Sequence, residues 1–196
     1  IPVGPDDHAS GPSDAKLTVV EYGDYQCPYC GQAYPIVEKL RADFADSMRF
    51  VFRNLPLADV HPHAEAAAEM AEAVALQGKF WEMHDTLYEN QRDLSDRALR
   101  GYVEEVGADV DEAAKAIAGG GPRQRVEADF ESAIRSGANG TPTFFVNGKK
   151  VVGDLPYADF VKYLAFDPNA GGIAVASDRG MLDRIRQWFG TLPSRS

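Results

Sequence analysis

Cys27 and Cys30 are the two cysteines of this 196-residue chain, and Pro28 and Tyr29 separate them in the stretch VVEYGDYQCPYCGQAYP. Two thiols at this spacing can form and break a disulfide with each other, or can supply two of the ligands of a zinc ion. Two cysteines are too few to form the framework of a disulfide-stapled domain. The pair therefore predicts redox or metal chemistry rather than a structural crosslink.

The cysteines lie where a strand pattern gives way to a helix pattern. The run LTVVEY before them is typical of a buried strand, and a helix pattern begins at Pro28 and contains Pro35, where we expect a kink. A cysteine at a helix start lies near free N–H groups and the positive end of the helix dipole, which stabilise a thiolate. Cys27 is therefore the predicted nucleophile and the more exposed thiol. Cys30, one turn later, is the thiol predicted to resolve a mixed disulfide.

The rest of the chain predicts an α/β protein with an all-helical insertion. A second strand, MRFVFRNLP, is followed by a run of helix patterns and then by TPTFFVNGKKVVG, in which Asn147-Gly148 predicts a tight hairpin turn. The segment PYADFVKYL predicts a closing helix. Without the helical block, the order is β-α-β followed by β-β-α, which can close as one sheet with helices on its faces.

These patterns divide the chain into four parts. We expect a linker or loose arm over residues 1–16, a sheet domain over 17–61 and 138–165, a helical insertion over 62–137, and a tail over 166–196 with an amphipathic helix. We expect that helix to dock on the body of the protein. An oligomer contact or attachment to a partner is the alternative.

Charge and hydropathy exclude two classes of partner. The formal net charge of −10 argues against nucleic-acid binding. The sequence contains no run of 18 or more apolar residues, so it predicts no membrane span. The compartment is unassigned: the cytoplasm is slightly favoured, and a cell-envelope or periplasm-like location stays open because the chain starts at Ile1 rather than Met.

The motifs together resemble the thioredoxin superfamily and, within it, the DsbA-like thiol-disulfide oxidoreductases. VVEYGDYQCPYC and GTPTFFVNG look like the active-site helix and the cis-proline loop of that family. RNLPLADVHPHA and GKFWEMHDTLYENQ look like segments of bacterial DsbA-like domains, some of which are fused to sodium/proton antiporters. The resemblance covers about residues 15–165 and implies a thioredoxin-like fold.

The resemblance implies a role for five residues. Cys27 would be the attacking thiolate and Cys30 the resolving thiol. Pro142 would be a cis-proline facing them, and Thr141 would offer its backbone to an extended substrate strand. Glu21 would be a buried acid that accepts the Cys30 proton.

The implied activity is disulfide exchange with protein thiols or disulfides, with an unidentified redox partner and no bound cofactor. Pro28 and Tyr29 would form the active-site loop. Tyr29 stands where the strongly oxidising member of the family has a histidine, so we expect a higher Cys27 pKa and a less oxidising disulfide. The alternative is a non-catalytic redox-sensing or regulatory module attached to a membrane transporter.

The remaining polar candidates have plainer interpretations. His61 and His63 could complete a metal site with the cysteines, but their spacing is unusual for zinc, so we interpret them as a helix-entry residue and a first-turn surface residue. His84 lies on an apolar helix face with Phe80, Trp81, Leu87 and Tyr88 and is predicted to be a hydrogen-bonded core residue. Asp24 is interpreted as a loop residue.

Overall fold

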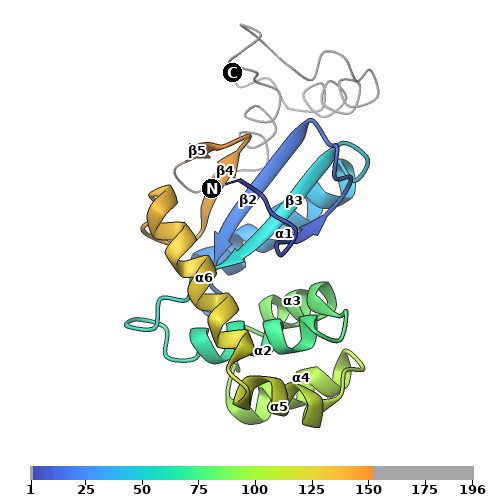
Figure 1. The fold of residues 1–196 in the computed structure, drawn as a ribbon, viewed down its shortest axis with the longest axis vertical. Coiled ribbons are helices and arrows are strands. Elements are labelled where there is room, and N and C mark those ends of the chain that lie inside the picture. Colours follow the sequence, from blue (N-terminus) through green and yellow to red (C-terminus); the bar gives the residue numbers. More distant parts are fainter. Residues whose placement is uncertain (1, 152–196) are drawn as a thin grey trace, which may run out of the picture.

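The structure is a computed structural model that describes residues 2–151, in which a sheet stands on a block of helices (Figure 1). The strands are β1 (His8–Ser10), β2 (Leu17–Gly23), β3 (Met48–Asn54), β4 (Thr143–Val146) and β5 (Lys149–Val151). The helices are α1 (Pro28–Asp43), α2 (Ala64–Ala75), α3 (Phe80–Glu89), α4 (Asp96–Glu105), α5 (Val110–Ala118) and α6 (Gly121–Ser136). The closing helix expected near residues 156–164 and the helix expected in the tail lie outside the described residues.

The sheet has five strands in the order β1-β3-β2-β4-β5. Strands β2 and β3 are parallel and are joined through α1, whereas β4 pairs antiparallel with β2 and with β5. The predicted order of β-α-β followed by a β-hairpin is therefore confirmed. The α/β architecture with one sheet that this order predicts is confirmed with it.

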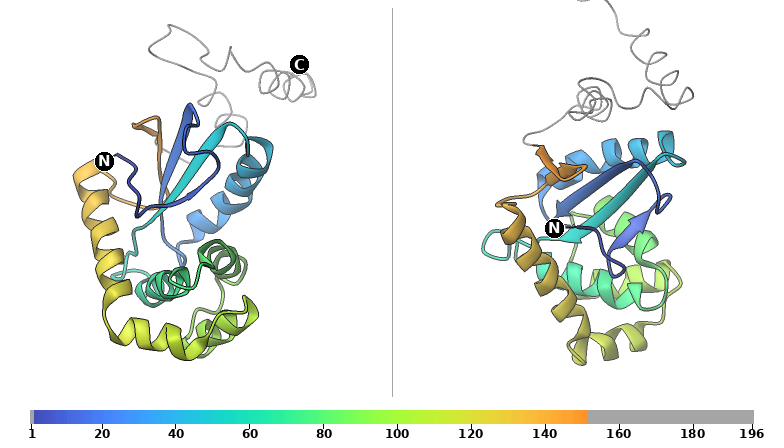
Figure 2. Two further views of the ribbon diagram at one scale, coloured as in Figure 1. Left: turned by 45° about the vertical axis from the view of Figure 1, so that its right-hand side comes forward. Right: turned by 45° about the horizontal axis from the view of Figure 1, so that its top comes forward.

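Both faces of the central strands are buried. Because side chains alternate along a strand, Val19 of β2 faces the core that contains both cysteines, and its neighbour Val20 faces a second core. Helix α1 covers the first face and the C-terminal half of α6 covers the second (Figure 2). The long apolar runs of β2 and β3 follow from this burial on two sides.

The hairpin between β4 and β5 turns where the sequence predicted it. Asn147 and Gly148 both have positive φ, at 46° and 78°, as a type I′ turn requires. The Asn147 side-chain oxygen also accepts a hydrogen bond of 2.8 Å from the Thr18 backbone N–H at the start of β2. This contact fixes the turn against the central strand.

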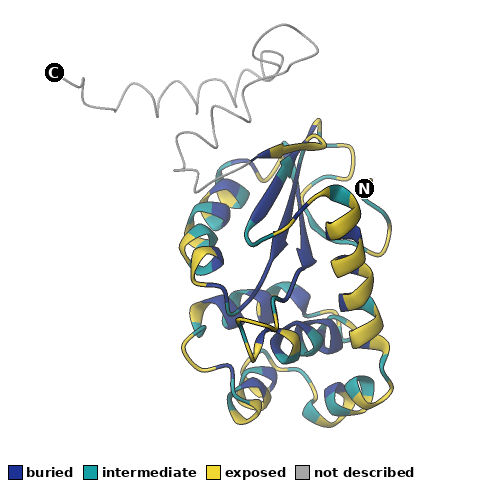
Figure 3. Ribbon diagram, turned by 90° about the vertical axis from the view of Figure 1, so that its left-hand side faces the viewer, coloured by how far each residue is buried: buried dark blue, intermediate teal, exposed yellow. Residues whose placement is uncertain are grey.

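The helices α2 to α6 lie between β3 and β4, and residues 64–136 contain no strand. Ser95 and Asp109 cap α4 and α5 by accepting hydrogen bonds from backbone N–H groups. Figure 3 shows the buried side of each helix turned toward the interior.

Helix α6 packs against the sheet as well as against the other helices of the insertion. Its first half packs near α2 and α5, and its last turns lie against the sheet, where Ala133 joins Tyr22 and Val51 in the second core. The Tyr22 hydroxyl lies 2.6 Å from the Ser132 hydroxyl of α6. One helix therefore connects the two parts of the protein.

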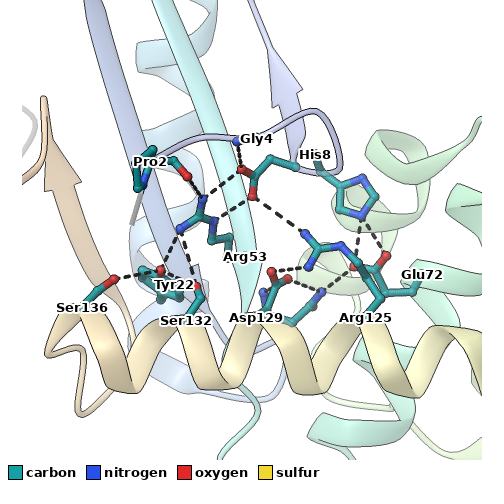
Figure 4. Close-up of polar contacts among 12 residues, drawn as sticks. Pro2, Gly4, His8, Tyr22, Arg53, Glu72, Arg125, Asp129, Ser132 and Ser136 are labelled. Atoms are coloured by element: carbon teal, nitrogen blue, oxygen red, sulfur yellow. Dashed lines mark hydrogen bonds and ion pairs between the residues drawn. The ribbon is translucent and has the colours of Figure 1, made fainter.

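The N-terminal residues form part of the fold, which corrects the expectation of a linker or loose arm. Strand β1 pairs antiparallel with β3, with His8 opposite Phe52. The Arg53 guanidinium, on β3, donates to both oxygens of Asp7, at 2.7 and 2.9 Å, and to the Pro2 carbonyl at 2.9 Å (Figure 4). The sequence pattern missed this strand because its three residues have no apolar alternation.

A second set of buried polar contacts continues from the arm into the helices (Figure 4). The Glu72 carboxylate, on α2, contacts His8 Nε2 at 2.8 Å and accepts a hydrogen bond of 2.7 Å from the Asn54 amide. The Asp129 carboxylate, on α6, accepts from the Asn54 backbone N–H at 2.9 Å. The end of β3 is therefore fastened to the arm and to two helices.

Candidate active site

Cys27 occupies the position before the first turn of α1. Its backbone is extended, with φ of −69° and ψ of 122°, and Pro28 begins the helix. Proline suits this position because its missing N–H would have no partner inside the helix. The sulfur of Cys27 consequently lies near the backbone N–H groups of Tyr29 and Cys30, which point out of the helix start.

The two thiols have opposite acidities. The pKa of Cys27 is lowered to about 5, mainly by a hydrogen bond from the Cys30 thiol and also by hydrogen bonds from Thr141 and the backbone N–H groups of Cys30 and Tyr29, which together outweigh the effect of burial. Burial raises the pKa of Cys30 well above its usual value, and the hydrogen bond to Cys27 and the charge of Glu21 raise it too. The first cysteine is therefore held as a thiolate and the second as a thiol.

Both cysteines are buried. Only 2% of Cys27 is exposed and none of Cys30, so Cys27 is the more exposed thiol by a small margin. The Cys27 sulfur lies 3.4 Å from the Thr141 carbonyl oxygen, because the loop before β4 packs over it. Tyr29, in contrast, is 55% exposed, and its side chain is not among the groups that lower the Cys27 pKa.

The loop of Thr141 and Pro142 lies opposite the helix start. The Thr141–Pro142 peptide bond is cis, as the motif predicted. Both residues are partly buried. The contact between the Thr141 carbonyl and Cys27 brings together two predicted site residues that are 114 positions apart in the sequence.

Glu21 is a buried acid of β2 beneath the cysteines. It is 3% exposed, and burial together with the charge of Glu38 raises its pKa to about 8, while Arg41 lowers it. The charge of Glu21 raises the pKa of Cys30. The prediction of a buried carboxyl near the pair therefore agrees with the structure, and its role as a proton acceptor stays a prediction.

Asp24 holds the backbone of the active-site loop, a role that the sequence interpretation missed. Its Oδ1 accepts from the backbone N–H groups of Gln26 and Cys27, at 2.7 and 3.2 Å, and its Oδ2 accepts from Leu57 at 2.9 Å and lies 2.7 Å from His61 Nδ1. An aspartate two and three residues before its donors is the pattern of an Asx turn, which could have predicted the first two contacts.

The histidines fall into two environments. His61 pairs with Asp24, so its interpretation as a simple helix-entry residue was incomplete, and His63 is exposed at the start of α2. His84 is buried and lies 3.1 Å from the Tyr25 hydroxyl, which confirms it as a bonded core residue. Within residues 2–151, no group of three or more His, Cys, Asp or Glu side chains is placed to hold a metal ion.

Gln91, which follows α3, connects the helical block to the active-site loop. Its amide donates hydrogen bonds of 2.7 and 3.1 Å to the carbonyls of Tyr25 and Cys27. Gly31 leaves room for this contact, since a Cβ there would lie 1.9 Å from the Gln91 side-chain oxygen. No motif in the sequence marks this glutamine, because its partners are backbone atoms more than 60 residues away.

The sheet order, the cysteine pair at a helix start and the proline loop opposite it define a protein of the thioredoxin fold with a DsbA-like helical insertion. The chain belongs to the thioredoxin family, because the family model described as Thioredoxin matches residues 4–165. The resemblance inferred from the motifs is thereby confirmed.

The curated relatives are longer proteins. The chain is 50% identical over 151 residues to the Na(+)/H(+) antiporter NhaA 1 of Salinispora arenicola, and the match covers 76% of this chain and 23% of that protein. It is 44% identical over 153 residues to the Na(+)/H(+) antiporter NhaA of Herminiimonas arsenicoxydans, covering 78% and 24%. The chain thus spans about a quarter of these relatives, consistent with a DsbA-like domain of the kind fused to such antiporters.

Solved structures of redox proteins share the fold. BdbD from Bacillus subtilis superimposes with a TM-score of 0.73 at 25% identity, over 81% of this chain and 90% of that one. The thiol-disulfide exchange protein alpha-DsbA2 from Wolbachia pipientis gives 0.73 at 21% identity, over 81% and 85%. In the described part of the chain, every helix is too short or too polar to cross a lipid bilayer.

Proposed function

We propose that this chain is a thiol-disulfide oxidoreductase that exchanges disulfides with protein substrates through Cys27 and Cys30. The observation that supports this most directly is the pairing of a Cys27 pKa of about 5 with a Cys30 pKa raised well above its usual value. A low-pKa thiolate is a good leaving group and is present for attack at neutral pH, and a protonated neighbour is held back until a mixed disulfide forms.

The reaction proceeds in two exchanges. The Cys27 thiolate attacks one sulfur of a client disulfide, so that a Cys27–client disulfide forms and the other client sulfur leaves as a thiolate. Cys30 then loses its proton to Glu21 and attacks the Cys27 sulfur, which releases the second client thiolate and leaves the Cys27–Cys30 disulfide. The client gains two electrons and the cysteine pair loses two, and the reverse sequence oxidises a client dithiol.

The loop of Thr141 and Pro142 is the proposed docking site for the client. The contact of the Thr141 carbonyl with Cys27 places this backbone beside the reacting sulfur. An extended client segment that hydrogen-bonds to the Thr141 backbone would bring its own sulfur to Cys27. No bound cofactor is required, because the electrons reside in the thiols.

Trapping of clients tests this assignment. Cys30→Ser should accumulate mixed disulfides with disulfide-containing test proteins, because Cys27 still attacks and nothing resolves the product. Cys27→Ser is the matched control and should accumulate none. Non-reducing electrophoresis followed by mass spectrometry of the bands identifies the linked cysteine, and adducts at residue 30 in the Cys27→Ser variant would refute the roles assigned here.

The antiporter relatives favour a second candidate, a redox-sensing module attached to a transporter. A sensor would be oxidised once and would turn over slowly. Repeated oxidation of a dithiol peptide in a glutathione buffer separates the two: many turnovers per protein support the oxidoreductase, and a single stoichiometric oxidation supports the sensor.

A further inference from the structure

Two side chains hold the backbone that leads into Cys27. Asp24 accepts the backbone N–H of Gln26 at 2.7 Å and that of Cys27 at 3.2 Å. Gln91, which follows α3 in the helical block, donates its side-chain amide to the carbonyls of Tyr25 and Cys27, at 2.7 and 3.1 Å. The proposed nucleophile is therefore held through its N–H by one side chain and through its carbonyl by the other.

The carbonyl of Cys27 has two donors. It accepts the backbone N–H of Gly31 at 3.1 Å, as the first turn of α1 requires, and the Gln91 amide at 3.1 Å. A residue has only two freely rotating backbone bonds, and the contacts of Cys27 with Asp24 and with Gln91 restrain one on each side of its Cα. These restraints set the direction of the Cα–Cβ bond, and the sulfur consequently faces the Thr141 carbonyl at 3.4 Å.

The surroundings of Gln91 are built to hold it in this position. The Asn90 N–H bonds to the Thr86 carbonyl at 3.1 Å, and the Asp93 N–H bonds to the Asn90 carbonyl at 3.0 Å, so the backbone on both sides of Gln91 is fixed. A Cβ on Gly31 would lie 1.9 Å from the Gln91 side-chain oxygen and 2.7 Å from its amide carbon. Helix stability alone would favour alanine at position 31, so the glycine there is explained by the room that it leaves for Gln91.

The contacts that make Cys27 acidic all depend on where its sulfur lies. They are hydrogen bonds with the Cys30 thiol, with Thr141 and with the backbone N–H groups of Cys30 and Tyr29, and each of them lowers the pKa of Cys27. Hydrogen bonds weaken steeply when their distance or angle departs from the optimum. A Cys27 backbone with more freedom would weaken several of these bonds at once, while burial would still oppose the thiolate.

We propose that Gln91 is a positioning residue of the active site, which fixes the Cys27 carbonyl so that the sulfur stays at the start of α1 beside the Thr141 backbone. This inference rests on the proposed oxidoreductase function. Gln91 acts through the backbone of Cys27 and not on the client. It gives the helical block a task in the chemistry, because the end of α3 supplies the side chain that holds the nucleophile.

The acidity of Cys27 tests this role. In Gln91→Ala the carbonyls of Tyr25 and Cys27 lose the amide, and we expect the half-ionisation pH of Cys27 to rise by about one unit. At pH 5 the thiolate fraction would then fall from about a half to about a tenth, and alkylation of Cys27 would slow about fivefold. The pH dependence of iodoacetamide alkylation, read by mass spectrometry of the reduced protein, measures this change.

Gln77→Ala is the matched control. Gln77 follows α2 in the same helical block and is partly buried, as Gln91 is. Its side-chain amide donates to the Asp109 carbonyl at 2.9 Å, and its side-chain oxygen accepts the Asp109 N–H at 2.7 Å. The control therefore removes bonds of the same kind elsewhere and should leave the acidity of Cys27 unchanged. An equal rise in both variants, or no rise in Gln91→Ala, would refute the positioning role.

Gly31→Ala displaces Gln91 by a second route, while alanine itself favours the helix. Because the added Cβ must push the Gln91 side chain aside, this variant should raise the half-ionisation pH of Cys27 about as much as Gln91→Ala does. In the Gln91→Ala background, Gly31→Ala should add no further rise, since the side chain that it displaces is already absent. Rises that add in the double variant would contradict the proposal.

The positioning role and the proposed function fail under different results. Alkylation reports the Cys27 thiolate whether or not the protein exchanges disulfides with clients. Repeated turnover of a dithiol peptide by the natural protein, with no change of acidity in Gln91→Ala, would overturn the positioning role alone. A change of acidity in Gln91→Ala without turnover by the natural protein would overturn the proposed function, and the catalytic meaning of Gln91 with it.

Discussion

Asp24 and His61 face each other behind the start of α1, with Asp24 Oδ2 2.7 Å from His61 Nδ1. The same aspartate accepts the backbone N–H of Cys27 through its other oxygen. The Asp24 carboxylate is fully buried, whereas 16% of the His61 side chain is exposed. The pair therefore links the loop before α2 to the nucleophile Cys27.

We expect Asp24→Asn to lower the free energy of unfolding by about 1–3 kcal/mol. The carboxylate oxygen that now accepts the Leu57 N–H would be replaced by an NH₂ group, so two donors would face each other. Urea denaturation measures this change. Asp59→Asn, at an exposed aspartate of the same loop, is the control and should change the unfolding free energy by less than about 0.5 kcal/mol. Equal effects of the two variants would contradict the role given to Asp24.

The acidity of Cys27 should depend on Cys30. The hydrogen bond from the Cys30 thiol is the largest cause of the lowered Cys27 pKa, so Cys30→Ala should raise that pKa. Cys30→Ser should raise it less, because the serine hydroxyl can still donate a hydrogen bond to the Cys27 sulfur. The pH dependence of iodoacetamide alkylation, read by mass spectrometry, gives the values. In the natural protein, Cys27 should be half-ionised near pH 5 and react before Cys30. Alkylation of Cys30 at the lower pH would reverse the two roles.

The raised pKa of Glu21 predicts how stability changes with pH. Its pKa is about 8 in the folded protein and has an ordinary value of 4.5 when the chain is unfolded, so between these values the folded state holds more protons and stability falls as pH rises. The loss is at most about 1.4 kcal/mol for each pH unit. Glu21→Gln removes this titration. The unfolding free energy of the variant, measured relative to that of the natural protein, should therefore rise between pH 5 and pH 8. Unfolding curves that shift in parallel with pH would contradict this.

The contact of Asp7 with Arg53 should hold the N-terminal arm in place. Asp7→Ala leaves the buried Arg53 guanidinium without its carboxylate and should cost about 3 kcal/mol of unfolding free energy. Backbone amides of residues 7–10 should then exchange faster with deuterium, as measured by mass spectrometry of peptides. Asp6→Ala, at an exposed position, is the control. Unchanged exchange in Asp7→Ala would show that strand pairing alone fixes the arm.

Local chemistry made part of this structure predictable. The turn at Asn147 and Gly148 depends on two adjacent residues that tolerate positive φ, and the Cys27 helix start depends on the residues beside it. The pairing of His8 with Phe52 depends on a contact between segments 44 positions apart, and Asp24 meets His61 across 37. A single sequence contains no periodic signal for such pairs, so β1 and the Asp24–His61 contact emerged only from the structure.

Strand β1 also determines how the sheet meets other molecules. Without it, the outer edge of β3 would present unpaired backbone groups along a strand that contains Phe50, Val51 and Phe52, and such an edge is a template for intermolecular strand addition. The pairing of His8 to Ser10 with these three residues occupies that edge. Strand β1 thereby shields this edge of the sheet from strand addition by another chain. We expect a protein cleaved between β1 and β2 that loses β1 to expose the edge of β3 and to aggregate more readily.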